Sequence, residues 1–180
     1  MNIFYLDKNP KIAAQMHCDK HVVKMVTEYA QMLSTAHRVC DGDVVADRKG
    51  LYKTAFKNHP CTAWVRQSKG NYNWLSDLWG YLGCEYQYRY GQKVHKAATK
   101  GWLFYSPDNI PRKDTVFTGV SSPPPQCMPE KYMCNPHTAT LDDTVQAYRN
   151  YYWHDKSPIA DWTRREPPNW YMVKLMENAA

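Results

Sequence analysis

The clearest hydrophobic pattern in the chain lies between residues 71 and 90. Its positions follow the helical spacing i, i+3, i+4, i+7, i+11 and i+14. They are Leu75, Leu78, Trp79, Leu82, Tyr86 and Arg89. All but the last are typical core residues, so the pattern predicts an amphipathic helix over 71–90 that buries its apolar side.

The N-terminal part of the chain predicts a short strand followed by a long helix. Residues 2–7 form an apolar run that ends in an acid, which is typical of a buried strand or of an extended lead-in. Asn9 then serves as a helix cap, with Pro10 in the first helical position. Turn residues at 40–43 predict that this helix continues to about Arg38.

Three further helices and a proline-rich loop are predicted in the rest of the chain. Residues 58–70 favour a short helix with Pro60 in its first turn and Gly70 as its stop, and 93–102 favour another. Thr140, with an acid three residues later, predicts a capping box at the start of a helix over 140–155. Seven prolines make 104–138 a long irregular loop, and a loop of this length is usually either functional or mobile.

These elements predict a mostly α fold: a single-domain helical bundle over 1–180 with a short N-terminal strand and the proline-rich loop. A chain of 180 residues is long enough to bury a substantial core. Six cysteines without a CxxC pair, and no apolar signal before them, favour free thiols in a reducing cytosol over zinc fingers or a disulfide framework. No apolar run is long enough to span a membrane.

Charge and aromatic content indicate the class of partner. The net charge is +6 and aromatic residues make up 14% of the chain. Basic groups attract phosphates and aromatic faces stack on bases, so a nucleic acid or a nucleotide is the expected partner. The chain has no GxGxxG, GxxxxGK[ST] or GxSxG motif, which argues against the common dinucleotide-binding, P-loop and hydrolase classes.

The segment HCDKHVVKM (17–25) crowds ionisable groups into the first long helix. At 100° per residue His17, His21, Lys24 and Glu28 share the side opposite the apolar arc, flanked by Lys20. Two histidines at i, i+4 can chelate a metal, but the lysines repel a cation, so no metal or other cofactor is predicted. A phosphate-binding stripe with histidine acid–base chemistry is one interpretation, and a solvated face with a Lys24–Glu28 ion pair is the other.

Two polar residues, Asp19 and His37, fall inside the apolar arc of the same helix. They are too far apart along a continuous helix to be partners, so each needs one from another segment. Asp19 is expected either to anchor a backbone group or an arginine, or to act as a general acid or base of shifted pKa.

Other candidate residues lie further along the chain. His59 precedes a proline at a helix entrance, where it either caps the helix or contributes to an anion site. Arg89 and Lys93 lie among tyrosines, and Arg149 lies among four aromatic residues, which suits contact with bases and phosphates. A nucleophilic role for Cys127 is not favoured, because the sequence places no histidine beside it.

Several motifs resemble those of a known group of proteins. DKHVVKM (19–25), YAQMLSTAHR (29–38), NHPC (58–61), EYQYRYG (85–91), QCMPEKY (126–132) and AYRNYY (147–152) resemble a family of small proteins encoded by tailed bacteriophages. The resemblance covers nearly the whole chain and implies a phage protein that works in the host cytoplasm. It implies no catalytic role for any residue.

A second, shorter resemblance is to the pyrimidine-dimer DNA glycosylases of phages, which are also small, basic and mostly helical. It is carried by PNWY (168–171) near the C-terminus. These enzymes use a freed N-terminal amine as nucleophile, whereas Met1 here precedes Asn2, a pair that disfavours removal of the methionine.

The leading hypothesis is an enzyme that acts on a nucleic acid or nucleotide. Its expected acid–base residues are His17, His21, Glu28 and Asp19. Its expected phosphate-contacting residues are Lys20, Lys24, His59, Arg89, Lys93 and Arg149. The alternatives are a non-catalytic binder that sequesters a nucleotide signal, a pyrimidine-dimer-type glycosylase, and a module that binds a host protein.

Overall fold

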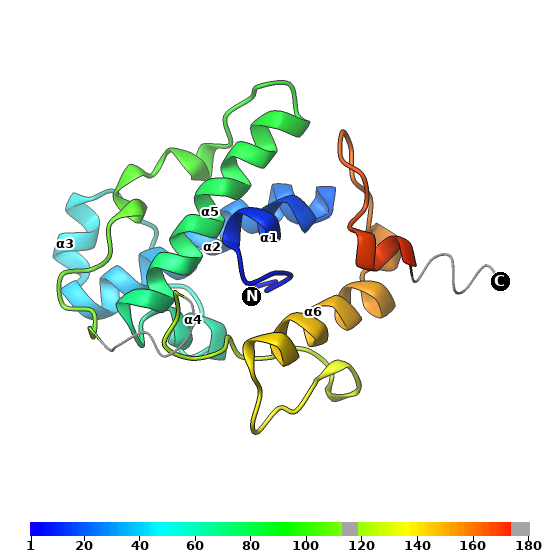
Figure 1. Cartoon of the computed structure of the whole chain (residues 1–180). Coiled ribbons are helices and arrows are strands. Elements are labelled where there is room, and N and C mark those ends of the chain that lie inside the picture. Colours follow the sequence, from blue (N-terminus) through cyan, green and yellow to red (C-terminus); the bar gives the residue numbers. More distant parts are fainter. Residues whose placement is uncertain (113–118, 174–180) are drawn as a thin grey trace.

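Two long helices, α2 (Asp19–Asp41) and α5 (Lys69–Arg89), form the centre of the protein in the computed structural model, which describes residues 1–112 and 119–173 (Figure 1). The other α-helices with labels are α1 (Pro10–Met16), α3 (Asp43–Arg48), α4 (Pro60–Val65) and α6 (Leu141–Asp155), and residues 169–173 are also helical. Short 3-10 helices are η1 (Lys96–Thr99), η2 (Gly101–Phe104), η3 (Glu130–Tyr132) and η4 (Ser157–Ile159). The predicted mostly α, single-domain fold is confirmed.

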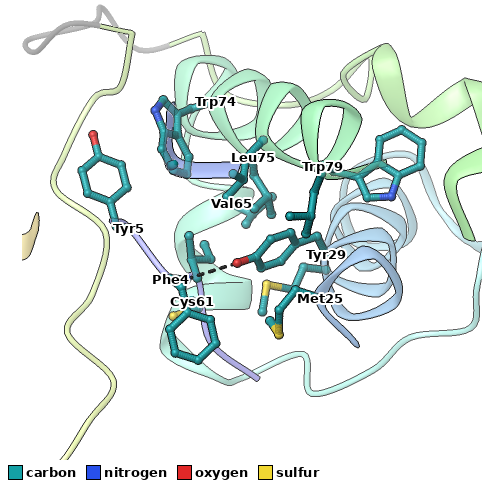
Figure 2. Close-up of a cluster of buried hydrophobic side chains, with 14 of the residues drawn as sticks. Phe4, Tyr5, Met25, Tyr29, Cys61, Val65, Trp74, Leu75 and Trp79 are labelled. Atoms are coloured by element: carbon teal, nitrogen blue, oxygen red, sulfur yellow. Dashed lines mark hydrogen bonds between the residues drawn. The ribbon is translucent and has the colours of Figure 1, made fainter. Parts of the chain in front are cut away.

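The hydrophobic core lies where α2, α4 and α5 meet the N-terminal segment. Figure 2 shows Met25 and Tyr29 of α2 facing Leu75 and Trp79 of α5. All four side chains are at most 1% exposed. Leu75 and Trp79 belong to the helical pattern in the sequence, which therefore identified the buried side of α5.

The N-terminal segment is extended and buried, but it is not a strand. Residues 1–112 and 119–173 contain no β-ladder, so the predicted N-terminal strand is wrong and the alternative of an extended lead-in is correct. Side chains hold its backbone instead: Tyr29 Oη accepts from the Phe4 N–H at 3.2 Å (Figure 2), and Arg149 Nε donates to the Leu6 carbonyl at 3.0 Å. These bonds replace those of a sheet.

The predicted long helix from Pro10 to Arg38 is broken at His17 and Cys18. Both residues adopt extended backbone angles, so α1 ends at Met16 and α2 begins at Asp19. The Arg89 guanidinium donates to the carbonyls of Gln15 and His17 at 3.0 and 2.9 Å, which satisfies acceptors that a helix end leaves free. A side chain from α5 thus stabilises the break, and no pattern within residues 10–38 reveals it.

The middle of the chain differs from its prediction in two places. The helix over 58–70 ends at Val65, and Gly70 lies in the first turn of α5 rather than at a stop, because Ser68 caps α5 through the Asn71 N–H at 3.1 Å. Helix α3 follows Gly42, which has a positive φ of 89°, in a region expected to be a loop. The predicted helix over 93–102 is present as η1 and η2.

The C-terminal part matches its prediction more closely. Thr140 and Asp143 form the expected capping box of α6, with the Thr140 hydroxyl accepting from the Asp143 N–H at 3.1 Å. In the described part of 104–138 the chain is irregular apart from the last residue of η2 and from η3. The tail packs Trp170 and Tyr171 against the hydrophobic core.

None of the helices in the described residues is both long enough and apolar enough to cross a membrane.

Candidate ligand-binding cleft

The structure separates the four residues of the predicted stripe. His17 and His21 are buried, with exposed fractions of 0% and 6%, whereas Lys24 is exposed. Lys24 and Glu28 form an ion pair at 3.2 Å. The prediction that both histidines face a ligand together with Lys24 and Glu28 is therefore wrong, because the break between α1 and α2 turns His17 inward. The alternative interpretation, a solvated face, predicted a Lys24–Glu28 ion pair, and this pair is present.

Both buried histidines hydrogen-bond to tyrosines. His17 Nδ1 donates to the Ala13 carbonyl at 2.7 Å, so Nε2 accepts from the Tyr29 hydroxyl at 2.9 Å. His21 Nδ1 lies 2.5 Å from the Tyr152 hydroxyl. Burial lowers the pKa of His17 to about 4 and that of His21 to about 3. This placement supports a structural role for both imidazoles in their neutral form.

Asp19 anchors an arginine and a backbone group, which is the first of the two roles expected for it from the sequence. Its Oδ1 lies 2.8 Å from Arg89 Nη1, and its Oδ2 accepts from the Thr163 N–H at 2.8 Å. Burial alone would raise the pKa of Asp19, but the hydrogen bonds from Thr163 and Arg89 lower it below its usual value.

Arg89 is a buried structural cation rather than a phosphate contact. Its side chain is 0% exposed and pairs with Glu85 at 2.8 Å as well as with Asp19. Its remaining N–H groups donate to the two carbonyls at the end of α1. The prediction that Arg89 binds phosphate is wrong, because a ligand cannot reach the guanidinium.

The remaining candidate residues are a helix cap, two exposed lysines and a buried histidine. His59 caps α4, with its Nδ1 accepting from the Cys61 N–H at 3.2 Å, so the capping interpretation is correct. Lys20, Lys24 and Lys93 are exposed, and Lys20 and Lys24 are neighbours at i, i+4 on α2. His37 has its own partners, the Tyr72 hydroxyl and the Tyr105 carbonyl at 3.0 and 3.1 Å. The structure thus leaves Arg149 as the predicted phosphate contact that lines a cleft.

This cleft lies between α1, the second half of α6 and residues 164–170, and has a volume of about 730 Å³. Three arginines and one large aromatic ring dominate its lining: Arg149, Arg164, Arg165 and Trp170. Residues from both ends of the chain build its walls, because Trp162 Nε1 donates to the Met16 carbonyl at 3.1 Å and holds the C-terminal segment against α1.

The three arginines differ in how far their charge is neutralised. Arg165 makes two hydrogen bonds to Glu85 at 2.8 and 2.9 Å. Arg149 lies 3.5 Å from Asp7, and its guanidinium lies over the Trp170 ring at 5.5 Å. Arg164 Nη1 donates to the Tyr88 carbonyl at 3.1 Å and has no ion pair within residues 1–112 and 119–173. Arg164 and Arg149 are therefore the cations best able to meet a phosphate.

A left-handed backbone conformation and two hydrogen bonds hold Arg164 in place. Its φ is +60°, a left-handed conformation that non-glycine residues seldom adopt. The Tyr88 hydroxyl donates to the Arg164 carbonyl at 3.0 Å. Tyr88 of α5 therefore hydrogen-bonds both the backbone and the guanidinium of Arg164. Such conformations persist only where surrounding contacts stabilise them.

The sequence named Arg149 as a candidate phosphate contact, but it indicated neither this cleft nor Arg164, Arg165 and Trp170 as parts of it. The signal was the segment TRREPPNWY (163–171), in which four residues, two of them prolines, separate two adjacent arginines from an aromatic pair. This segment predicts a surface of cations and aromatic rings, but its position beside Arg149 depends on the tertiary fold.

Comparison with known proteins gives no family for this chain: no protein-family model, no curated protein and no solved structure matches it.

Proposed function

We propose that the protein binds a nucleotide or a short single-stranded nucleic acid in the cleft between α1 and α6. The observation that supports this most directly is the placement of the half-buried Trp170 ring beside Arg149 and near Arg164. Stacking on an aromatic face and pairing with a guanidinium are the two interactions that a base and its phosphate require.

The cleft is lined by three arginines and one acid, Glu166, and this excess of positive charge agrees with an anionic ligand. Arg165 is already neutralised by Glu85, while Arg149 is only loosely paired and Arg164 meets only a carbonyl. A phosphate would gain two charge-assisted contacts without breaking a tight ion pair. The net charge of +6 adds a long-range attraction that depends on salt.

Binding affinity measured by calorimetry tests this proposal. The ligands are a panel of nucleoside mono- and triphosphates and a short single-stranded oligonucleotide. Trp170→Ala is expected to weaken binding by about 10- to 100-fold, because stacking contributes about 1–3 kcal/mol per base. Arg164→Ala is expected to weaken binding and to reduce its dependence on salt concentration.

Matched controls exist for both substitutions. Trp102 is 54% exposed and Arg48 is exposed on α3, and neither lines the cleft. Trp102→Ala and Arg48→Ala should keep wild-type affinity. Equal affinity of wild type, Trp170→Ala and Arg164→Ala, with all three folded by circular dichroism, would contradict the proposal. Chromatography of the recovered ligand then separates an enzyme from a binder that returns its ligand unaltered.

We also propose a second candidate, a pyrimidine-dimer-type glycosylase, which a different observation favours. Burial and then the Met1 α-amino group lower the pKa of His59, and Glu28 opposes this effect. The amine and the Glu28 carboxylate are therefore both close enough to act electrostatically on one imidazole. Asn2 holds the N-terminus there, since its Nδ2 donates to the Cys127 carbonyl at 2.8 Å.

Trapping with borohydride tests the glycosylase candidate. An amine that displaces a damaged base forms an imine with the sugar, and borohydride reduces this imine to a stable protein–DNA adduct. Ultraviolet-irradiated DNA should give the adduct with wild type, and acetylation of the N-terminus should abolish it. Glu28→Gln should lower the yield, whereas the exposed Glu130→Gln should leave it unchanged. Absence of any adduct with wild type would reject this candidate.

A further inference from the structure

Three soft or borderline metal ligands converge at the N-terminal end of α4. They are the His59 imidazole and the Cys61 and Cys127 thiols, and one donor atom from each lies within 4.8 Å of the other two. Cys61 follows the cap of α4, whereas Cys127 comes from the proline-rich segment 66 residues later. The tertiary fold therefore brings this cluster together.

We propose that His59, Cys61 and Cys127 bind a thiophilic divalent cation of the zinc class. Zinc takes thiolate sulfur at about 2.3 Å and imidazole nitrogen at about 2.0–2.1 Å in tetrahedral geometry. Two sulfurs of such a tetrahedron lie about 3.8 Å apart. The Cys61 and Cys127 sulfurs are 3.5 Å apart, so the thiol pair already has nearly the required separation.

The charge balance of the site also fits a divalent cation. Cys61 is 0% exposed, and one thiolate held there without a counter-ion would be costly. A divalent cation with two thiolates and a neutral imidazole forms a neutral unit, and binding releases two protons from the thiols. Three protein ligands leave one coordination position for water or a ligand.

Neighbouring groups hold the two cysteines in place. Tyr148 donates to the Pro125 carbonyl at 2.7 Å, and the Cys127 N–H lies 3.1 Å from the same carbonyl. The Asn2 Nδ2 group donates a hydrogen bond to the Cys127 carbonyl, and Asn2 Oδ1 lies 3.8 Å from the Cys61 sulfur. Such outer contacts orient the ligands of metal sites.

Metal binding requires one local exchange at His59. In the structure His59 Nδ1 accepts from the Cys61 N–H, and a neutral imidazole has a single nitrogen lone pair. The metal would take that lone pair in place of the cap bond. A disulfide is the competing chemistry for the two sulfurs, but it needs a separation of about 2.05 Å and gives the histidine no role.

Zinc content and cobalt spectroscopy test the site on the full chain under reducing conditions. Wild type dialysed against equimolar Zn²⁺ should retain about one ion per chain, and Co²⁺ should give thiolate charge-transfer bands with intense visible bands of a four-coordinate ion. Cys127→Ser should weaken zinc affinity by more than about 100-fold. His59→Asn should also lose affinity while keeping the helix start, because asparagine is a good cap.

Cys84→Ser is the matched control, since Cys84 is an exposed free thiol of α5 outside the cluster. It should retain metal and spectrum. Three results would overturn the proposal: no retained zinc in folded wild type, wild-type affinity in Cys127→Ser, or loss of the cobalt bands on Cys84→Ser. The measurement needs no nucleotide, so its outcome is independent of the proposed function.

Discussion

Replacing Arg89 with alanine is expected to lower the free energy of unfolding by about 3–5 kcal/mol. The substitution leaves the Glu85 carboxylate, which is 5% exposed, without its partner on α5, and it removes the cation from Asp19. It also frees the carbonyls of Gln15 and His17 at the end of α1. Arg165 still pairs with Glu85, so the buried charge keeps one partner.

Urea denaturation followed by circular dichroism measures this effect. A loss of this size is a large part of the about 5–15 kcal/mol typical of a domain. Arg89→Lys should recover only part of it, because an ammonium group cannot reach two carboxylates and two carbonyls in the fork geometry of a guanidinium. Lys93→Ala, at an exposed position just after α5, is the control and should change stability by less than about 0.5 kcal/mol. A comparable small change for Arg89→Ala would refute the structural role of Arg89.

Acidification from pH 7 to pH 5 is expected to destabilise the protein by about 4 kcal/mol through His17 and His21 alone. In the unfolded chain both titrate near 6.5, whereas in the folded chain burial lowers their pKa to about 4 and about 3. Between these values the unfolded state binds more protons, so stability falls as the pH decreases, with a slope for each histidine that approaches a limit of about 1.4 kcal/mol per pH unit near pH 5.

Hydrogen bonding explains why protonation of His17 is unfavourable. Its Nε2 accepts from Tyr29, whose oxygen in turn accepts from the Phe4 N–H, so a proton on Nε2 would remove the acceptor of a buried hydroxyl. Burial also lowers the pKa of His37, which adds to the loss in the same direction.

The dependence of unfolding free energy on pH between 5 and 6.5 measures this linkage. His17→Gln and His21→Gln should each flatten the average slope over this range by about 1 kcal/mol per pH unit, even where they lower stability at pH 7. Above pH 7.5 wild type and both variants should show the same slope. A wild-type unfolding free energy that stays constant from pH 7 to pH 5 would contradict the buried placement of the histidines.

The elements set by local pattern were predictable from the sequence. Leu75 and Trp79 at helical spacing identified α5, and Thr140 with Asp143 identified the start of α6, because helical periodicity and capping act within a few residues. The break at His17 was not predictable, because Arg89 stabilises it from 72 positions away.

For the candidate site the sequence predicted a class of ligand but not a location. Basic and aromatic composition favoured a phosphate-bearing, base-containing ligand, and Arg149 was among the predicted contacts. The helical wheel assumed one continuous helix, so it placed His17 on the same face as His21. It also could not show that Phe4 and Tyr152 cover His21 from other segments. The positions of Arg164 and Trp170 opposite Arg149, and of Cys127 beside His59, arise from contacts between distant segments.

The most direct test of the cleft as the ligand site is the NMR signal of the Trp170 indole N–H during titration with the tightest-binding nucleotide of the panel. The chain has seven tryptophans, and Trp170→Ala assigns this signal. A stacked base should shift the Trp170 signal far more than that of the exposed Trp102, with saturation at one ligand per chain. Saturable binding that leaves Trp170 unshifted would place the ligand elsewhere and contradict the proposal.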